Sequence, residues 1–318
     1  VYDQYGPPDV LRLEEVKIPV PKNNEVLVRV RAASINYADW QVLRGESFLL
    51  RLMNGVFKPR KKILGDDISG IVEAVGETAR QLHPGDEVFG ISNFDAFAEF
   101  ACVPENVLAV KPGGITFEQA AAIPEAGLTA LQGVRDNGRL KSGQKDLIFG
   151  DSVGVGTFAV HIAKSIGADV TGVCSTKKMG FVRSLGADHV IDYTKEDFTI
   201  NGLHYDLIFA AGGHRSIFDY QRALSPEGIY VCAGGSASQY FQALLLGPLV
   251  SMVSDKNFGS MYANLNKDDF LFLAALIEDG TLSHFIDRTY TLSEVPAALR
   301  YYGEGKAQGK IVITMENN

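Results

Sequence analysis

The feature that most constrains the fold is a strand, a glycine-rich turn, a helix and a second strand that follow one another in mid-chain. A short apolar run, 147–149, leads into the turn 150–156, which reads GDSVGVG. A helical pattern covers 157–166, and a second apolar run covers 169–174. Units of this kind place the pyrophosphate of a dinucleotide on the N-terminus of the helix. The alternative is an ordinary crossover between parallel strands, whose glycines only allow close packing of the helix.

The residues after the second strand indicate which dinucleotide the unit binds. An NAD site usually has an acidic residue about 20 residues after the turn, where it holds the ribose 2′-hydroxyl. Here the chain has Ser175, Thr176, Lys177 and Lys178. A hydroxyl group and two cations suit a 2′-phosphate, so we expect the chain to bind NADPH. Without this context, the two lysines would be interpreted as the solvated start of a helix.

The length and net charge of the chain indicate how many domains it has and which kinds of partner it can bind. At 318 residues it has the length of two domains of about 150 residues each. The formal net charge of −8 argues against nucleic acid or an anionic membrane as the main partner, because both require clustered cations. The basic run 58–62 is the exception. We interpret it as a solvated loop at the rim of the active site, with a membrane-surface patch as the alternative.

The cysteines and the apolar segments bear on the location of the protein. Cys102, Cys174 and Cys232 form no Cys-x-x-Cys pair, so no disulfide framework is implied and a reducing compartment fits. No apolar stretch has the length of an integral membrane segment, and no signal-peptide pattern is present. We therefore expect a cytoplasmic protein. Because the sequence begins at Val1 without Met, the alternative is an organellar stroma or matrix after removal of a transit peptide.

The pattern of apolar residues changes along the chain. In the first third, apolar and polar residues alternate over 25–32, which is typical of a strand, and turn clusters are frequent. Strand and helix signals alternate in the middle, which predicts a parallel, doubly wound sheet. The tail predicts helices over 267–279 and 294–302, the second with Ser293 as N-cap. A closing strand over 309–314 is expected to return to the first domain.

Several short motifs stand in a fixed order along nearly the whole chain. They are 33–40 (ASINYADW), 65–72 (GDDISGIV), 84–88 (PGDEV), 120–130 (AAAIPEAGLTA), the glycine-rich unit, 286–288 (IDR) and 309–310 (GK). In this order they resemble the zinc-free quinone oxidoreductase branch of the medium-chain dehydrogenase/reductase superfamily. Within that branch, the chain is most similar to the chloroplast-envelope and mitochondrial quinone oxidoreductase homologues and their bacterial relatives.

The resemblance implies an α/β fold, with a Rossmann doubly wound parallel sheet and a mostly β, GroES-like catalytic domain. It places the catalytic domain at 1–117 and 264–318 and the NADPH-binding domain at 118–263. The implied activity is zinc-independent hydride transfer from NADPH to quinones or α,β-unsaturated carbonyl compounds. The alternatives are a zinc-free alcohol or enoyl-thioester oxidoreductase and a non-enzymatic NADPH-binding protein of crystallin-like or regulatory kind.

The positions that hold catalytic zinc in other members of the superfamily carry different residues here. The resemblance places them at Asn36, Asp66 and Glu125, where relatives have cysteine, histidine and a second cysteine or a carboxylate. Zinc sites need about three good protein ligands, and zinc favours thiolate and imidazole, so we expect no functional metal. We interpret the three residues as a hydrogen-bonded polar pocket floor. Without a Lewis acid, the substrate must already be electron-poor.

The resemblance also implies candidate catalytic residues. Asn36 is the candidate for orienting the substrate or the nicotinamide, and a hydrogen-bond donor is needed where charge builds on a carbonyl oxygen. Tyr37 is the candidate proton donor, with a packing role as the alternative. Asp39 belongs either to the site or to the hydrogen bonding of its own loop. Related enoyl-thioester reductases use a tyrosine slightly downstream, and 45–48 (GESF) has none, which argues against the thioester alternative.

The cofactor contacts carry over residue by residue. Thr129 is expected on the nicotinamide side, Ser175 and Lys178 at the 2′-phosphate, and Tyr193 near the adenosine. The full expected set is Thr129, Gly150, Ser152, Val153, Gly154, Val155, Gly156, Ser175, Lys177, Lys178, Tyr193, Gly212 and Gly234.

The resemblance also bears on the oligomeric state. Segment 256–263 follows the last strand of the parallel sheet. In this family such a segment often pairs edge to edge with its twin, which covers an open sheet edge. We therefore expect a homodimer.

Two residues of the glycine-rich turn depart from the family pattern. Val153 stands where the family usually has glycine, and Asp151 stands where it has a small neutral residue. The middle glycine normally lets the backbone approach the pyrophosphate. Val153 crowds that approach, and Asp151 places negative charge near the phosphates.

Replacing Val153 with glycine should therefore tighten NADPH binding. Charge-assisted bonds to phosphate are short, about 2.7–2.9 Å, so removing a branched side chain from the close approach strengthens them. Glycine adds flexibility that costs up to about 1 kcal/mol of stability. Calorimetric titration of both proteins with NADPH measures the effect. Unchanged or weaker binding would mean that Gly154 makes the close approach instead.

Overall fold

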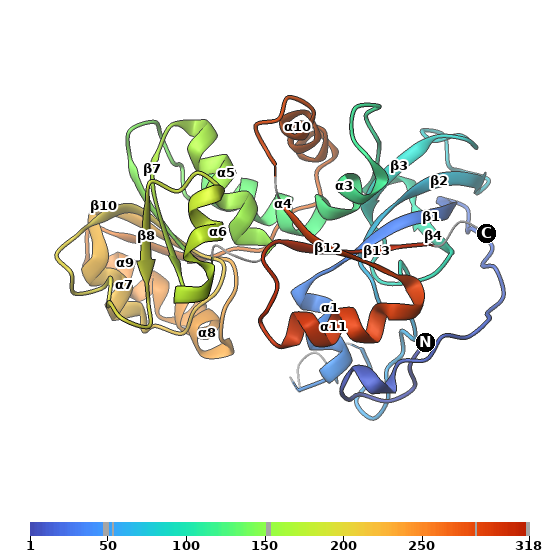
Figure 1. The fold of residues 1–318 in the computed structure, drawn as a ribbon, viewed down its shortest axis with the longest axis horizontal. Coiled ribbons are helices and arrows are strands. Elements are labelled where there is room, and N and C mark those ends of the chain that lie inside the picture. Colours follow the sequence, from blue (N-terminus) through green and yellow to red (C-terminus); the bar gives the residue numbers. More distant parts are fainter. Residues whose placement is uncertain (47–50, 53, 151–153, 284, 316–318) are drawn as a thin grey trace. The chain divides into compact units, whose positions relative to one another are not determined.

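The computed structural model describes the chain except residues 47–50, 53, 151–153, 284 and 316–318 (Figure 1). The chain forms two compact units. The first comprises Val1–Glu125, Leu265–Asp279 and Ile286–Asn318, and the second comprises Ala126–Asn264 and Gly280–Phe285. Each unit is built around its own sheet. In the described residues, no helix combines the length and the apolar character needed to cross a membrane.

The first unit contains a seven-stranded, mostly antiparallel sheet. Its strands run in the order β12-β13-β1-β2-β3-β5, and β4 also pairs with β1. The strands are β1 (Glu25–Ile35), β2 (Asp67–Val75), β3 (Glu87–Ile91), β4 (Phe100–Pro104), β5 (Leu108–Val110), β12 (Ile286–Thr291) and β13 (Lys310–Thr314).

Strand β1 organises this sheet because three other strands pair with it. Val26, Val28 and Val30 are buried on one face, as their alternation with more exposed residues predicts. β13 pairs antiparallel with the end of β1, with Ile35 opposite Ile311. The closing strand therefore returns to the first unit, which confirms the expectation from the sequence.

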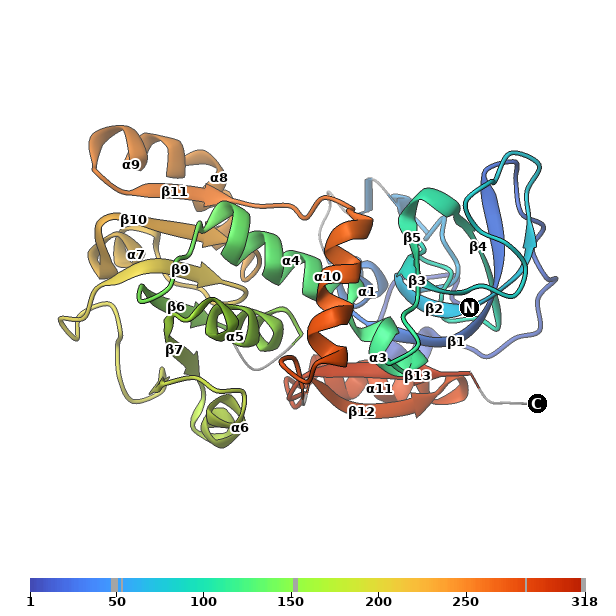
Figure 2. The ribbon, with the colours of Figure 1, turned by 90° about the horizontal axis from the view of Figure 1, so that it is seen from above.

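Helices of the first unit flank this sheet, and α11 lies beside β12 and β13 (Figure 2). They are α1 (Tyr37–Arg44), α3 (Phe117–Ala122), α10 (Lys267–Glu278) and α11 (Val295–Gly303); short 3₁₀ turns are η1 (Pro8–Val10), η2 (Glu105–Val107) and η5 (Leu292–Glu294).

The predicted N-cap of the last helix, Ser293, was wrong: Glu294 is the N-cap of α11, and Thr291 is the N-cap of the 3₁₀ turn η5 that precedes it. Thr291, not Ser293, begins the helical segment, and its backbone N–H donates to Glu294 Oε2 at 2.9 Å. The chain first makes the 3₁₀ turn η5, which places Ser293 inside the turn. A threonine followed three residues later by glutamate is the capping-box pattern, which outcompetes a lone serine.

The second unit contains a six-stranded sheet whose neighbouring strands are all parallel. The order is β11-β10-β9-β6-β7-β8, as in a doubly wound Rossmann fold. The strands are β6 (Lys145–Phe149), β7 (Asp169–Cys174), β8 (His189–Asp192), β9 (Tyr205–Ala210), β10 (Leu224–Cys232) and β11 (Asn257–Ser260).

Helices cover both faces of the parallel sheet. On one face, side chains of α7, α8 and α9 form a core with Phe149, Ile208 and Tyr230. On the other face, Gly133 of the π-helical turn η3 lies against Phe209 and its C-cap Gly138 lies against Leu207, and α5 packs on β6 and β7. The helical elements are α4 (Pro124–Leu131), η3 (Gln132–Asn137), α5 (Val155–Ile166), η4 (Thr176–Lys178), α6 (Met179–Ser184), α7 (Ile217–Ala223), α8 (Ala237–Leu245) and α9 (Gly247–Val253).

One side chain of the parallel sheet is poorly matched to its surroundings. Asp146 lies on β6, a central strand, and is fully buried. Neither of its carboxyl oxygens has a hydrogen-bond partner among the described residues. Burial therefore raises the pKa of Asp146 well above its ordinary value. The folded protein binds a proton at Asp146 that the unfolded chain releases above about pH 4.

Replacing Asp146 with valine should stabilise the protein. Burying an unpaired polar group costs roughly 1–3 kcal/mol, and valine suits a strand that is buried on both faces. Because the pKa is raised on folding, Asp146 makes stability fall as pH rises from about 4 toward the folded-state pKa. The variant should therefore gain roughly 1–3 kcal/mol near pH 7 and show a shallower decline with pH. Urea unfolding at several pH values measures both.

The matched control is Asp146→Asn, which removes the titration and keeps a polar group in the same place. It should flatten the pH dependence without the gain in stability. Loss of stability in the valine variant would show that the carboxyl group is solvated inside the fold.

Candidate functional site

The parallel sheet of the second unit has a point where the chain changes direction. From β6 the chain continues to β7 on one side, whereas from β9 it continues to β10 on the other. β6 and β9 are neighbours, so the loops after them separate at their carboxyl ends. Ligands of open parallel sheets bind in the crevice at such a switch point.

Glycines let the backbone segments at this point approach one another. Gly150, after β6, has φ +89°, and a Cβ added there would lie 2.7 Å from the backbone nitrogen of Gly212, after β9. The Gly212 N–H donates to the carbonyl oxygen of Phe149 at 3.0 Å. At Gly234, after β10, an added Cβ would lie 2.5 Å from the carbonyl oxygen of Ala211. Larger residues would close this backbone cradle, which therefore fits a ligand that contacts main chain.

Helix α5 begins beside the cradle. Its N-cap is Gly154, with φ +42°, and its first residues are Val155 and Gly156. The exposed N–H groups and the dipole of a helix N-terminus bind phosphate groups. Asp151, Ser152 and Val153 lie outside the described residues, so the roles expected of them stay predictions.

The segment after β7 supplies polar and cationic groups at the same edge of the sheet. Ser175 precedes the 3₁₀ turn η4, whose backbone bond runs from the N–H of Lys178 to the carbonyl oxygen of Ser175 at 2.9 Å. Lys177 is exposed and Lys178 is partly buried. Thr176 instead donates its hydroxyl proton to Asp192, at the end of β8.

Asp192 is the last residue of β8, the strand that pairs with β7. Hydrogen bonds from the hydroxyls of Thr176 and Thr194 lower the pKa of Asp192 to about 2. Its charge is therefore engaged by hydroxyl groups. Tyr193 is 40% exposed, and its ring centroid lies 6.1 Å from that of Phe149, just before the glycine cradle. Thr129 lies in α4 of the same unit and is partly buried.

In the first unit, the candidate catalytic residues stand at the start of α1. Asn36 is the N-cap and is 6% exposed, whereas Tyr37 is half-exposed and its hydroxyl oxygen accepts a bond from Gln41 Nε2 at 2.6 Å. Asp39 is fully buried and accepts bonds from the backbone N–H groups of Asn36 (2.9 Å) and Gly65 (2.8 Å). Asp39 thus ties its own helix to the loop before β2, which is the structural alternative considered for it.

A buried ion pair lies next to Asn36. The ammonium of Lys310, on β13, donates to Asn36 Oδ1 and to Asp67 Oδ2, the latter at 3.1 Å. Lys310 is 2% exposed and Asp67 is fully buried. Asp67 also accepts bonds from Ser34 Oγ (2.9 Å) and from the backbone N–H of Glu125 (2.9 Å). Four separate parts of the chain therefore meet at this carboxylate and its lysine.

The carboxyl groups around this pair have raised pKa values. Burial raises the pKa of Asp39 to about 7 and that of Asp66 to about 6, and neighbouring carboxylates add to both shifts. Burial and the charge of Asp67 raise the pKa of Glu125 well above its ordinary value. The positive charge of Lys310 opposes the shifts at Asp66 and Glu125. The fold thus gathers several acids around one fixed cation.

At the three positions where the resemblance places zinc ligands, this chain has Asn36, Asp66 and Glu125. The amide oxygen of Asn36 already accepts a hydrogen bond from Lys310. None of the three positions carries the thiolate or imidazole that zinc favours. Within the described residues, no three His, Cys, Asp or Glu side chains gather as a metal ion would require. The observed cation in this cluster is an ammonium group.

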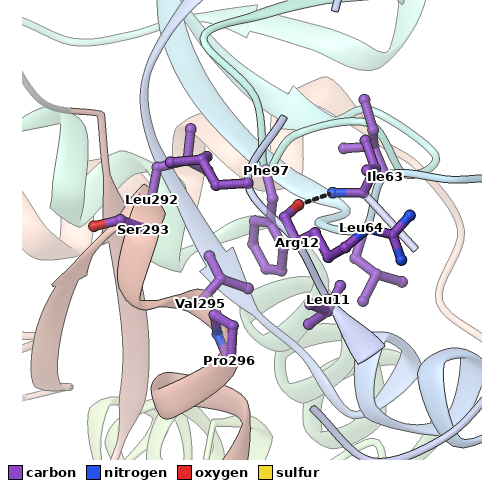
Figure 3. Close-up of a pocket in the computed structure, with 11 residues that line it drawn as sticks. Leu11, Arg12, Ile63, Leu64, Phe97, Leu292, Ser293, Val295 and Pro296 are labelled. Atoms are coloured by element: carbon purple, nitrogen blue, oxygen red, sulfur yellow. Dashed lines mark hydrogen bonds between the residues drawn. The ribbon is translucent and has the colours of Figure 1, made fainter. Parts of the chain in front are cut away.

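A separate pocket of the first unit is apolar (Figure 3). It is lined by Val1, Leu11, Arg12, Leu13, Ile63, Leu64, Phe97, Leu292, Ser293, Val295 and Pro296. None of the predicted catalytic residues is among these lining residues, and Arg12 is the charged side chain among them. The apolar pocket and the polar cluster around Lys310 are thus separate features of the first unit.

Sequence reasoning missed Lys310 and Asp67 as members of the site. Both stood inside motifs that carried the family resemblance, GK at 309–310 and GDDISGIV at 65–72. The available signal was a lysine at the head of an apolar strand, Lys310–Thr314. A cation in that place needs a buried anionic partner.

Comparisons with known proteins bear on the family and the fold of the chain. Residues 22–132 match the family model "Alcohol dehydrogenase GroES-like domain", and residues 185–313 match "Zinc-binding dehydrogenase". The chain is 32% identical to the chloroplast envelope quinone oxidoreductase homolog of Arabidopsis thaliana, over 98% of this chain and 96% of that protein. It is also 32% identical to the chloroplastic NADPH-dependent alkenal/one oxidoreductase of the same organism, over 98% and 78%.

Solved structures give the same result. The quinone oxidoreductase from Coxiella burnetii superposes with a TM-score of 0.88 at 29% identity, covering 99% of this chain and 98% of that one. The Escherichia coli quinone oxidoreductase complexed with NADPH has a TM-score of 0.84 over 98% of both chains. At 23% identity, this second likeness shows the fold alone.

Proposed function

Because this chain belongs to the quinone oxidoreductase branch of the medium-chain dehydrogenase/reductase superfamily, we propose that it reduces quinones or α,β-unsaturated carbonyl compounds with NADPH, without zinc. The observation that carries the proposal is the glycine cradle at the switch point of the parallel sheet, with Ser175, Lys177 and Lys178 after the next strand. Relatives named as quinone and alkenal/one oxidoreductases support the substrate class.

The residues of the second unit fit a dinucleotide. Gly150, Gly212 and Gly234 leave room for main-chain contact, and the N-terminus of α5 offers N–H groups to the pyrophosphate. Ser175 and the two lysines would hold the 2′-phosphate, and the Tyr193 ring would lie near the adenosine. When bound, NADPH supplies a hydride equivalent.

The residues of the first unit supply the polar surroundings for the reduction. A substrate that accepts hydride at carbon gains negative charge on its carbonyl oxygen, which a fixed donor stabilises. Asn36 is the proposed donor, and Tyr37, half-exposed beside it, is the proposed source of the proton. The charge of Lys310 takes the place of a metal in this cluster. Electron-poor substrates are therefore the class that this site suits.

Turnover is the direct test of this function. The purified protein should reduce an ortho-quinone such as 9,10-phenanthrenequinone, or a simple enone, with NADPH, and treatment with a chelator should not change the rate. NADPH binding without turnover of either substrate class would favour the non-enzymatic alternative. Stoichiometric zinc together with chelator-sensitive turnover would contradict the zinc-free class.

NADPH should bind at least tenfold more tightly than NADH. Charge-assisted bonds to the 2′-phosphate contribute roughly 1.5–3 kcal/mol each. Lys177→Ala and Lys178→Ala should each weaken NADPH binding roughly tenfold and leave NADH binding unchanged. Fluorescence titration with both cofactors measures this. Lys141→Ala is the matched control, because Lys141 is exposed and precedes β6 at the opposite end of the strand. Equal affinities of the unmodified protein would contradict the assignment.

We also propose that the protein is a homodimer formed at the β11 edge of the parallel sheet. β11 pairs with β10 on one side and is the end of the strand order. Exposed apolar side chains gather on the neighbouring helices α8 and α9 and just after β11: Phe241, Leu244, Leu245, Leu249, Met252, Val253 and Tyr262. A second copy would cover both the open edge and these side chains.

Light scattering at micromolar concentration should show a species of twice 34.5 kDa. Met252→Asp, at a side chain that is 82% exposed, should shift the protein toward monomers. Leu203→Asp, at an exposed apolar residue between β8 and β9, should leave the mass unchanged. A single monomeric species of the unmodified protein would contradict the dimer.

The location of the protein is either cytoplasmic or, as for the chloroplastic relatives, organellar. Cell fractionation distinguishes the two.

A further inference from the structure

The side-chain amide of Asn36 is held on one side only. Its Oδ1 accepts a hydrogen bond from the ammonium of Lys310. Its Nδ2 is buried and has no hydrogen-bond partner among the described residues. A buried donor without an acceptor is costly and rare in folded proteins, so the orientation of this amide needs a physical reason.

Lys310 provides that reason. An ammonium group carries three donors and no acceptor, so only the oxygen of the amide can face it. Turning the amide over would place two N–H donors against the ammonium. Lys310 therefore determines which end of the Asn36 amide points away from the cluster.

Lys310 itself has little freedom to move. Its ammonium group donates a hydrogen bond to Asp67 Oδ2 at 3.1 Å. Asp67 in turn accepts hydrogen bonds from Ser34 Oγ and from the backbone N–H of Glu125. The lysine and the aspartate are both almost completely excluded from solvent. A rigid set of bonds thus connects the core of the first unit to the orientation of one amide group.

We propose that Lys310 is a positioning residue, which orients the Asn36 amide so that its Nδ2 hydrogens are kept free for the carbonyl oxygen of the substrate. This inference rests on the proposed reductase function. Preorganised donors are effective because they need no reorientation when charge develops on the oxygen. An electron-poor quinone or enone supplies the acceptor that Nδ2 lacks.

Two substitutions at Asn36 test the donor itself. Asn36→Asp keeps an oxygen for Lys310 and removes the N–H donors, whereas Asn36→Ala removes both. Each should lower kcat about 10²–10³-fold with the ortho-quinone or the enone, as losing one oxyanion donor does. NADPH affinity should stay unchanged in both. Wild-type turnover by Asn36→Asp would overturn the proposal, because only the bond to Lys310 would then matter.

Substitutions at Lys310 test the positioning. Lys310→Gln can donate or accept, so it no longer dictates the amide orientation, and kcat should fall at least tenfold. Lys310→Arg, which has only donors, should retain more turnover than the glutamine variant. In the Asn36→Ala background, Lys310→Gln should cause no further loss of kcat. Losses that multiply in the double variant would show that Lys310 acts by another route and would overturn the proposal.

Controls separate positioning from folding. Lys310→Gln leaves Asp67 without its cation, so Lys310→Gln/Asp67→Asn is made as well, and it should fold and keep the low kcat. Wild-type kcat in this folded double variant would overturn the proposal. Lys111→Met is the matched loss of a buried lysine. Lys111 bonds Glu87 and the carbonyl oxygens of Pro112 and Ile115, and its replacement should leave kcat unchanged.

The orientation also has a readout that needs no turnover. A neutron structure of the unmodified protein should show the Nδ2 deuterons of Asn36 directed away from Lys310. Nδ2 facing Lys310 would overturn the inference directly. An unmodified protein with the expected orientation that reduces neither substrate class would instead contradict the proposed function, so the two failures are distinguishable.

Discussion

The buried carboxylate of Asp67 joins four separate parts of the first unit through hydrogen bonds. It accepts hydrogen bonds from Ser34 on β1, from the backbone of Glu125 in α4 and from Lys310 on β13. These groups come from distant parts of the chain, and each donates a hydrogen bond to the same buried negative charge. Removing one partner from a buried ion pair costs about 3–5 kcal/mol, because the other charge is left without compensation. The bond from Lys310 to Asn36 also depends on this carboxylate, which pairs with the same ammonium group. Burial raises the pKa values of the nearby acids, and the charge of Asp67 adds to these shifts.

In the second unit, the backbone itself forms the candidate binding site. Parallel strands β6, β9 and β10 end side by side, and the loops after them must leave space for a ligand that touches main chain. Glycine is the residue that allows this, because the positions where a Cβ would collide with a neighbouring loop lie directly after these strands. The first unit thus provides charges in fixed places, whereas the second provides shape. The proposed zinc-independent reduction would use both.

Much of the second unit could be predicted from local sequence. The glycine-rich turn and the apolar runs beside it predicted β6, α5 and β7, and the structure confirms all three, with α5 starting two residues earlier at Val155. The return of the last strand to the first unit was also predicted correctly, since its apolar run has no partner nearby in sequence. Ser293 was misjudged because the competing cap at Thr291 depends on a bond to Glu294 that three-residue spacing only suggests.

The polar cluster could be predicted only in part. The family resemblance supplied Asn36, Asp66 and Glu125, but the role of Lys310 depends on contacts across 274 and 243 positions of the chain. No periodicity reveals that a lysine will be buried, or that its anion will be Asp67 and not the adjacent Asp66. The sequence also did not predict that the carboxyl group of Asp146 has no hydrogen-bond partner among the described residues. The alternation of residues along a strand indicates burial, but it does not indicate hydrogen bonding.

The pairing of β13 with β1 has a consequence for how the protein is made. Synthesis proceeds from the N-terminus, so β1 and Asp67 leave the ribosome long before Lys310 does. Until then the first unit has an unpaired strand edge and a carboxylate without its cation, whereas nearly all of the second unit is contiguous in sequence and is complete earlier. Most of the second unit can therefore fold before the first unit is complete. During that interval, the exposed edge of β1 is the surface that a chaperone would have to protect.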